Sequence, residues 1–174
     1  MTVIKADAYT KDKYSKEIYT LLENGDREFV PPLSSRSSTT QSTMTPIESG
    51  NGIRDYFNEM IKQPLLIAME DGELMGFVSY REDHVTDVID VSTLPNIYVS
   101  TLMVAESARG KGLTKRMYTV LFDELYPERS VFTRTWSTNY AHIRILSAFG
   151  FDELLRLKDH RGAGIDTVYY VKKK

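Results

Sequence analysis

Residues 102–114 read LMVAESARGKGLT, and the change of character along this stretch decides the fold. An apolar run typical of a buried strand ends at Val104. Two glycines, at positions 110 and 112, then flank a lysine, and an amphipathic run starts at Leu113. Successive backbone N–H groups bind a phosphate where no Cβ blocks the approach, and the positive end of a following helix adds to the attraction. The stretch therefore fits either a phosphate-binding loop or a plain glycine turn.

Two familiar phosphate motifs do not match this loop. The chain lacks GxxxxGK[ST], which disfavours a P-loop nucleotidase. The pattern GxGxxG also fails, because Lys115 stands where its third glycine belongs. On these letters alone, the two descriptions of the loop are equally supported.

The whole chain of 174 residues shows no internal repeat and is most simply one domain, residues 1–174. Asp71-Gly72 between two apolar runs predicts a β-hairpin. Apolar periodicity predicts helices over 11–26, 50–63, 113–128 and 139–150, and strands over 2–10, 64–70, 74–83, 96–107, 130–138, 151–160 and 165–173. The order βααβββαβαββ has hairpins at both ends and a βαβ unit in the middle. It predicts an α/β (α+β) protein with a mixed, mostly antiparallel sheet.

The composition of the chain excludes or disfavours several classes of protein function. The 22 basic and 24 acidic residues give a net charge of -2, which disfavours nucleic acid as a partner. The absence of cysteine excludes disulfides, thiolate zinc sites and a cysteine nucleophile. His84, His142 and His160 are too far apart for a preformed metal motif, so we expect no metal. With no signal-peptide pattern and no apolar run of about 18 residues, we expect a cytoplasmic protein without a membrane partner.

Residues 29–50, FVPPLSSRSSTTQSTMTPIESG, have the most unusual composition in the chain. Their density of Ser, Thr and Pro predicts a long surface loop with short helical turns, and such loops are often functional. The alternative is a disordered connector. If the loop is functional, Arg36 is a candidate to meet an acidic group on a substrate, although a lone exposed arginine usually does not.

With the following helix, LMVAESARGKGLT resembles motif A of the GCN5-related N-acetyltransferases (GNAT), whose signature is [Q/R]-x-x-G-x-[G/A]. Arg109 takes the Q/R position and Gly112 the glycine, while Thr114 replaces the final small residue. A second family element is an asparagine that opens the helix after the next strand, with Gly-Phe eleven and twelve residues later. Asn139 and the pair Gly150-Phe151 match that spacing.

The resemblance covers roughly residues 3–172. It implies a six- to seven-stranded sheet flanked by about four helices and split between two central parallel strands, here 100–104 and 132–138. It also implies N-acetyltransferase activity, with acetyl-CoA as co-substrate in the split and direct transfer to an amine in a ternary complex. The cofactor-binding residues that it implies are Leu102, Met103 and Val104 for the pantetheine arm, Arg109, Gly110, Lys111, Gly112, Leu113 and Thr114 for the pyrophosphate, and Asn139 for the pantetheine end. Asn139 is equally explained as a helix N-cap.

The sequence departs from the family at Leu146, where many members carry a tyrosine that protonates the CoA thiolate. A thiol has a pKa near 8.5 and leaves tolerably well, whereas an alkyl amine with a pKa near 10.4 must lose a proton before it attacks. A general base is therefore the greater need. The candidates are Glu82, Asp83, His84, Asp87 and Asp90 as bases and Tyr98 and Tyr140 as acids, and each has a structural interpretation as well. For His142 and Trp136 we expect a structural role.

Two other function classes remain as alternatives. Leu146 keeps open a non-catalytic acyl-CoA-binding or regulatory domain of the same fold. A nucleic-acid-binding domain using Lys111, Lys115 and Arg116 finds little support in the net charge. The expected partners are a small-molecule or peptide amine acceptor and a second copy of the chain in a homodimer.

Overall fold

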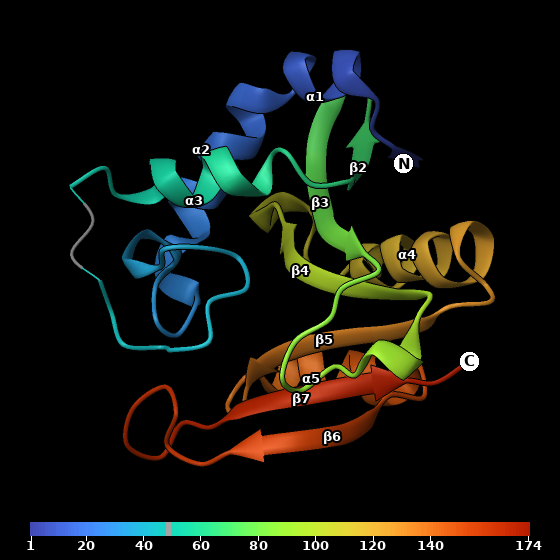
Figure 1. Ribbon diagram of the computed structural model, residues 1–174. Coiled ribbons are helices and arrows are strands. Elements are labelled where there is room, and N and C mark those ends of the chain that lie inside the picture. The colour runs from blue at the N-terminus through green and yellow to red at the C-terminus, as the bar shows by residue number, and fades with distance from the viewer. Residues whose placement is uncertain (48–49) are drawn as a thin grey trace.

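The computed structural model describes residues 1–47 and 50–174 (Figure 1). Its α-helices and β-strands in chain order are β1 (Thr2–Lys5), α1 (Ala8–Lys13), α2 (Ser15–Gly25), α3 (Ile53–Met60), β2 (Leu65–Glu70), β3 (Glu73–Glu82), β4 (Asn96–Val104), α4 (Leu113–Thr119), β5 (Ser130–Trp136), α5 (Tyr140–Ala148), β6 (Asp152–Leu157) and β7 (Thr167–Lys172), and α4 continues as a π-helix over Val120–Leu125. The strands form one seven-stranded sheet in the order β1-β2-β3-β4-β5-β7-β6. Within the described residues, the single parallel pair is β4 with β5. The expected mixed, mostly antiparallel sheet is confirmed.

Helices cover both faces of the sheet. Successive residues of a strand point to opposite faces, and β2 shows this directly. Its Leu65 and Ile67 pack with residues of α2 and α3, while Leu66 and Ala68 pack with residues of α4 and α5. In Figure 1, α1–α3 gather beside the N-terminal strands and α5 lies behind β5 and β7. Nowhere in residues 1–47 and 50–174 is a helix long and apolar enough to cross a bilayer.

The N-terminal elements differ from the prediction. The strand expected over 2–10 ends at Lys5, because the Asp7 side chain accepts a hydrogen bond of 2.8 Å from the Thr10 N–H and starts α1. The helix expected over 11–26 is in fact two helices that meet at Tyr14. The Tyr14 backbone leaves helical geometry there, and its hydroxyl donates to the Gly72 carbonyl oxygen at 3.1 Å.

The loop expected over 29–50 lies along the C-terminal half of the molecule, and its positions 48–49 fall outside the described residues. It contains the short helical turn Leu33–Ser35, in agreement with the prediction. The Asp26 carboxylate anchors this turn, since it accepts from both the N–H and the hydroxyl of Ser34 at 2.7 Å. The turn between β6 and β7 lies beside the same loop at the left of Figure 1, and Arg161 of that turn donates to the Val30 carbonyl oxygen.

The central strands β4 and β5 pair over only four residues each, Asn96–Val99 with Ser130–Thr133. Beyond this point the two strands separate, and β4 continues to Val104 paired with β3 alone. A bulge marks the point of separation. On β3, Tyr80 pairs with Val99 and Ser79 with Thr101, so that Ser100 is the extra residue. The split expected between the central parallel strands is therefore present.

Candidate functional site

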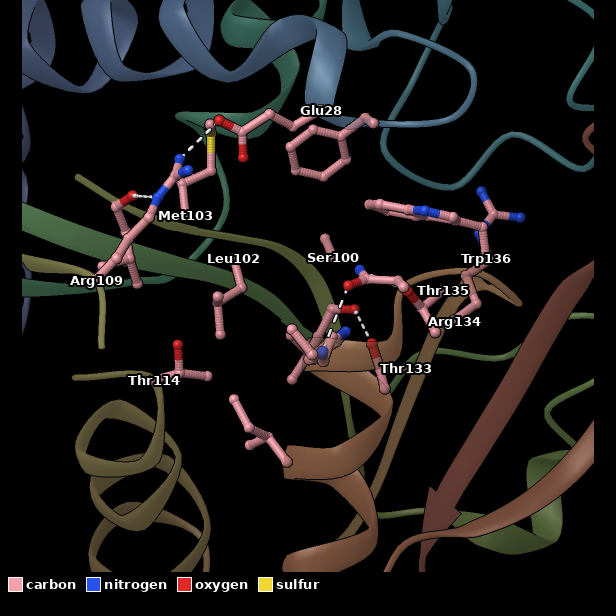
Figure 2. Close-up of a pocket in the computed structure, with 17 residues that line it drawn as sticks. Glu28, Ser100, Leu102, Met103, Arg109, Thr114, Thr133, Arg134, Thr135 and Trp136 are labelled. Atoms are coloured by element: carbon pink, nitrogen blue, oxygen red, sulfur yellow. Dashed lines mark hydrogen bonds and ion pairs between the residues drawn. The ribbon is translucent and has the colours of Figure 1, made fainter. Parts of the chain in front are cut away.

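A cavity of about 350 Å³ fills the space where β4 and β5 part (Figure 2). It is lined by Glu28, Phe29, Val99, Ser100, Leu102, Met103, Val104, Arg109, Thr114, Thr133, Arg134, Thr135, Trp136, Asn139, Ala141, His142 and Ile145. Figure 2 shows Arg109, Met103 and Thr114 on one side and Arg134 and Trp136 on the other. The cavity therefore joins the glycine loop to the end of β5.

One wall is the edge of β4 that β5 leaves unpaired. Leu102, Met103 and Val104 line the cavity here, as the family resemblance implied. On this side the backbone N–H and C=O groups of β4 have no neighbouring strand to pair with. Such an edge can pair with an extended ligand as it would with another strand.

The glycine loop closes one end of the cavity. Gly110 and Gly112 adopt positive φ of 73° and 76°, a conformation in which any side chain is strained. The Leu113 side chain is buried in the core, so only its backbone can serve a ligand. Of the loop residues expected to bind pyrophosphate, Arg109 and Thr114 line the cavity, whereas Gly110, Lys111, Gly112 and Leu113 do not.

An ion pair lies at the rim of the same end. The Nη2 atom of Arg109 is 2.7 Å from Oε1 of Glu28, and Arg109 Nε donates to the Val104 carbonyl oxygen at 3.4 Å. Figure 2 shows both contacts as dashed lines. The Arg109 side chain thus connects the glycine loop to the segment that follows α2. Nothing in the sequence had singled out Glu28.

Asn139 joins the cavity to the start of α5. Its Oδ1 accepts from the His142 N–H at 3.4 Å, and its Nδ2 donates to the Thr135 hydroxyl at 3.1 Å. The N-cap interpretation of Asn139 is confirmed. Because the residue also lines the cavity, its cap position leaves it placed to contact a ligand.

Ser100 places a hydroxyl in the cavity wall at the bulge of β4. Its Oγ is buried and has no hydrogen-bond partner among the described residues. The neighbouring Thr133 hydroxyl is occupied, since it donates to the Val99 carbonyl oxygen at 3.1 Å. A buried hydroxyl without a partner is uncommon in a native protein, and the residue that carries it lines the cavity.

His142 and Tyr118 form a hydrogen-bonded pair behind the wall, with 2.6 Å between Nε2 and the hydroxyl oxygen. Burial lowers the pKa of His142 to about 4 and raises that of Tyr118. The imidazole is therefore neutral near pH 7. The expectation of a structural role fits this contact, but His142 also lines the cavity.

Two of the acidic candidates lie outside the cavity lining. Glu82 accepts from the Tyr126 hydroxyl at 2.6 Å, and this bond, together with Lys5 and Arg129, lowers its pKa. Asp83 lies 3.5 Å from Arg129, and its carboxylate accepts from the Asn96 N–H. Both carboxylates are engaged in contacts around the end of β3.

The other five candidates are also outside the lining: His84, Asp87, Asp90, Tyr98 and Tyr140. His84 packs on Tyr98 with 4.8 Å between ring centroids, and burial, Arg81 and Arg134 lower its pKa. Tyr140 is 71% exposed at the start of α5. The role of all seven candidates in catalysis stays a prediction, and none of them lines the cavity.

Leu146 is fully buried in the core beside Met117 and Tyr118. Its side chain supplies neither a hydroxyl nor any part of the cavity wall. A replacement for the tyrosine of many family members must therefore come from elsewhere in the lining.

Three residues at or near the far end of the cavity were missed or misjudged from sequence, of which Arg36 lies outside the lining. Arg36 was expected to be exposed, yet it is 7% exposed, because it packs under the loop that carries it and donates twice to the Pro31 carbonyl oxygen. Arg134 was not considered, and Trp136 was assigned to the core, but both line the cavity. Alternation along β5 was the available signal, since it places 134 and 136 on one face.

Within residues 1–47 and 50–174, the structure contains no group of three or more His, Cys, Asp or Glu side chains that could hold a metal ion.

Comparisons with known proteins agree with this architecture. The model of the acetyltransferase (GNAT) family matches residues 35–151. A ribosomal-protein-alanine N-acetyltransferase from Brucella melitensis superimposes with a TM-score of 0.68 and 16% identity over 100% of both chains. An N-acetyltransferase from Staphylococcus aureus gives a TM-score of 0.68 and 17% identity, covering 99% of this chain and 97% of its own. A Salmonella typhimurium structure with its cofactor acetyl-CoA gives 0.64 and 18%, covering 99% and 93%. At these identities the structures establish the fold, and no curated protein matches the sequence.

Proposed function

This chain belongs to the acetyltransferase (GNAT) family, and from that premise we propose that it transfers an acetyl group from acetyl-CoA to an amine by direct transfer in a ternary complex. The observation that carries the proposal is the cavity between β4 and β5. A free strand edge, the glycine loop and Asn139 all border it. The Salmonella typhimurium structure, which has a similar fold and contains acetyl-CoA, supports the same co-substrate.

The residues present fit acetyl-CoA. The unpaired edge of β4 at Leu102–Val104 offers alternating N–H and C=O groups to the amides of the pantetheine arm. The Arg109 N–H already donates to the Glu106 carbonyl oxygen at 3.2 Å, so the backbone amides of 110–114 are the donors offered to the pyrophosphate, with Gly110 and Gly112 allowing close approach. The Asn139 side chain, at the N-cap of α5, lines the cavity and offers a polar group to the end of the pantetheine arm.

Acetyl-CoA supplies an activated thioester. In the transfer, the neutral amine nitrogen bonds to the carbonyl carbon and the carbon–sulfur bond breaks. The nitrogen loses one proton to water or a base, and the departing thiolate gains one. The products are one N-acetylated amine and one free CoA.

Within this scheme we assign Ser100 to the reacting end of the cavity. Its free hydroxyl is a donor for the thioester oxygen or for the departing sulfur, and it needs no displaced partner. A fixed hydrogen-bond donor placed where negative charge develops stabilises the transition state. The amine proton leaves through water, because no carboxylate within residues 1–47 and 50–174 lines the cavity apart from Glu28 at its rim.

Leu146 favours a second candidate function, an acyl-CoA-binding or regulatory domain without catalysis. Its burial in the core removes the hydroxyl that many family members use as an acid. A general acid contributes about 10²–10⁴ to rate, so its loss slows transfer without abolishing it.

Calorimetric titration with acetyl-CoA tests the binding half of the proposal. We expect saturable binding and a rise in unfolding temperature, since a ligand at about 100 times its Kd stabilises the native state by about 2.7 kcal/mol. No heat and no thermal shift at millimolar acetyl-CoA would overturn both candidate functions. Turnover then separates the two.

A further inference from the structure

Three arginines from distant parts of the chain lie at or near the end of the cavity opposite the glycine loop. Arg134 lines the cavity, whereas Arg36 and Arg161 pack on its lining residues Phe29 and Trp136. Arg36 comes from the loop after α2, Arg134 from β5 and Arg161 from the turn between β6 and β7. Arg36 and Arg161 are 7% and 8% exposed. Arg36 and Arg161 donate to the adjacent carbonyl oxygens of Pro31 and Val30, so the two groups lie near each other. Burial, together with Arg36 and Arg134, lowers the pKa of Arg161 to about 9.

Among residues 1–47 and 50–174, no carboxylate forms a salt bridge with any of the three arginines. In residues 1–47 and 50–174, ion pairs to Asp or Glu involve other arginines, at positions 81, 109, 116, 129 and 156. Asp26 raises the pKa of Arg36 only weakly, and its carboxylate is already bonded to Ser34. Like charges gathered in a protein interior disfavour one another unless an anion compensates them.

The observed partners of the three guanidinium groups are neutral. Arg161 donates to the Thr167 hydroxyl at 2.9 Å and to a backbone carbonyl oxygen. Arg134 donates to the Tyr169 hydroxyl at 3.2 Å. A guanidinium carries five N–H donors, so each retains donors that these contacts do not use.

Aromatic rings hold the charged groups at the cavity. Arg161 lies 5.9 Å from the centre of the Trp136 ring, and Arg36 lies 5.6 Å from that of Phe29. Phe29, Trp136 and Arg134 all line the cavity. The positive cluster therefore borders the part of the cavity that lies away from the unpaired edge of β4, where the second substrate is expected.

We propose that the acceptor is a small amine that also carries a carboxylate, which Arg134 binds with the support of Arg36 and Arg161. This inference rests on the proposed function, since it names the substrate class of the same cavity. The planar fork of arginine matches a carboxylate through two parallel hydrogen bonds. A carboxylate here supplies the negative charge that no side chain of residues 1–47 and 50–174 brings into an ion pair with the cluster, and it turns the amine end of the substrate toward Ser100.

The test compares the standard L-amino acids with their carboxamides, which have nearly the same shape and no negative charge. With acetyl-CoA present, we expect at least one amino acid to be acetylated with a kcat/KM about a hundredfold above that of its carboxamide. In Arg134→Gln this preference should fall to within a few fold. Arg144→Gln, which removes an exposed charge of α5 outside the lining, should keep it. Unfolding temperature and acetyl-CoA affinity of Arg134→Gln confirm that the variant folds.

A second measurement does not depend on turnover. Amino acids, but not their carboxamides, should raise the unfolding temperature of the acetyl-CoA-free protein, and Arg134→Gln should abolish that rise. Stabilisation by amino acids without any acetylation would support the carboxylate site and contradict the proposed transfer. Equal kcat/KM values and equal shifts in unfolding temperature for amino acids and their carboxamides would overturn the carboxylate inference and leave the proposed transfer intact. A preference for a phosphonate analogue over the amino acid would do the same.

Discussion

Arg109 and Glu28 form an ion pair of 2.7 Å at the rim of the cavity, and both side chains are about half exposed, at 47% and 53%. Exposed pairs of this kind contribute about 0–1 kcal/mol to stability. The pair holds the Arg109 guanidinium beside the glycine loop, where the pyrophosphate of acetyl-CoA is proposed to bind. Glu28 is therefore paired with the guanidinium group that an anionic ligand needs to contact.

Substituting each member of this pair should affect ligand binding in opposite directions. We expect Glu28→Gln to lower the Kd for acetyl-CoA by about two- to fivefold, because Arg109 becomes free for phosphate, and Arg109→Gln to raise it about tenfold. Isothermal titration at low and high salt measures both effects, and both should shrink as salt rises. Equal changes of the same sign would show that Arg109 has no role toward the ligand.

Gly112 provides a test of the loop with a matched control. Both Asp and Asn tolerate positive φ better than most residues, and a Cβ at Gly112 meets no atom within 4 Å. Gly112→Asn should thus weaken acetyl-CoA binding modestly, through local strain and crowding. Gly112→Asp adds a negative charge against the pyrophosphate and should weaken binding by at least about a hundredfold more. Identical affinities of the two variants would remove the loop from the site.

Ser100→Ala tests the hydroxyl at the bulge of β4. The buried Oγ has no partner to lose, so the free energy of unfolding should stay within about 0.5 kcal/mol of the wild type or rise. We expect kcat to fall by about tenfold or more with the Kd for acetyl-CoA unchanged, since the hydroxyl is proposed to act on the reacting group. Ser79→Ala, which removes another buried hydroxyl without a partner on the adjacent strand, is the control. Loss of activity in both variants would indicate a general effect on packing.

His142 should make stability depend on pH. Its folded pKa of about 4 is below the ordinary value of 6.5, so the unfolded chain binds the proton more readily between these two pH values. Its contribution is full above pH 6.5 and is lost as pH falls toward 4, and the loss amounts to about 2 kcal/mol at pH 5.

Urea unfolding at pH 7.5 and pH 5.0 measures this dependence. His84 and His160 also have lowered pKa values and add to the slope of the wild type. The difference between wild type and His142→Gln isolates one residue. We expect the variant to lose about 2 kcal/mol less stability between the two pH values. An unchanged slope would mean that His142 is accessible to protons in the folded state.

The sequence was sufficient to predict most of the sheet and the position of the glycine loop. The hairpin at Asp71-Gly72, the strand before Arg109 and the helix opened by Asn139 depend on local turn and capping chemistry, which neighbouring residues encode. The break at Tyr14 was not predictable, because it depends on a hydrogen bond to Gly72, far along the chain. Periodicity alone shows one continuous helix there.

The far end of the cavity was beyond sequence reasoning for a related reason. Arg36, Arg134 and Arg161 are unremarkable one by one, and their meeting depends on how the loop after α2 packs against the turn between β6 and β7. The bulge at Ser100 likewise results from the register of β4 on β3. Local patterns cannot specify such long-range contacts, and here these contacts form the proposed acceptor side of the site.

Acetyl transfer itself is tested most directly by following free CoA and acetylated product together, with acetyl-CoA at saturation and the L-amino acids as acceptors. We expect enzyme-dependent release of CoA that equals N-acetylated product mole for mole, with the gain of one acetyl group on the amine confirmed by mass spectrometry. Saturable binding of acetyl-CoA without acetylation of any amino acid, simple amine or peptide amino terminus would contradict the transfer and leave a domain that binds acyl-CoA without catalysis.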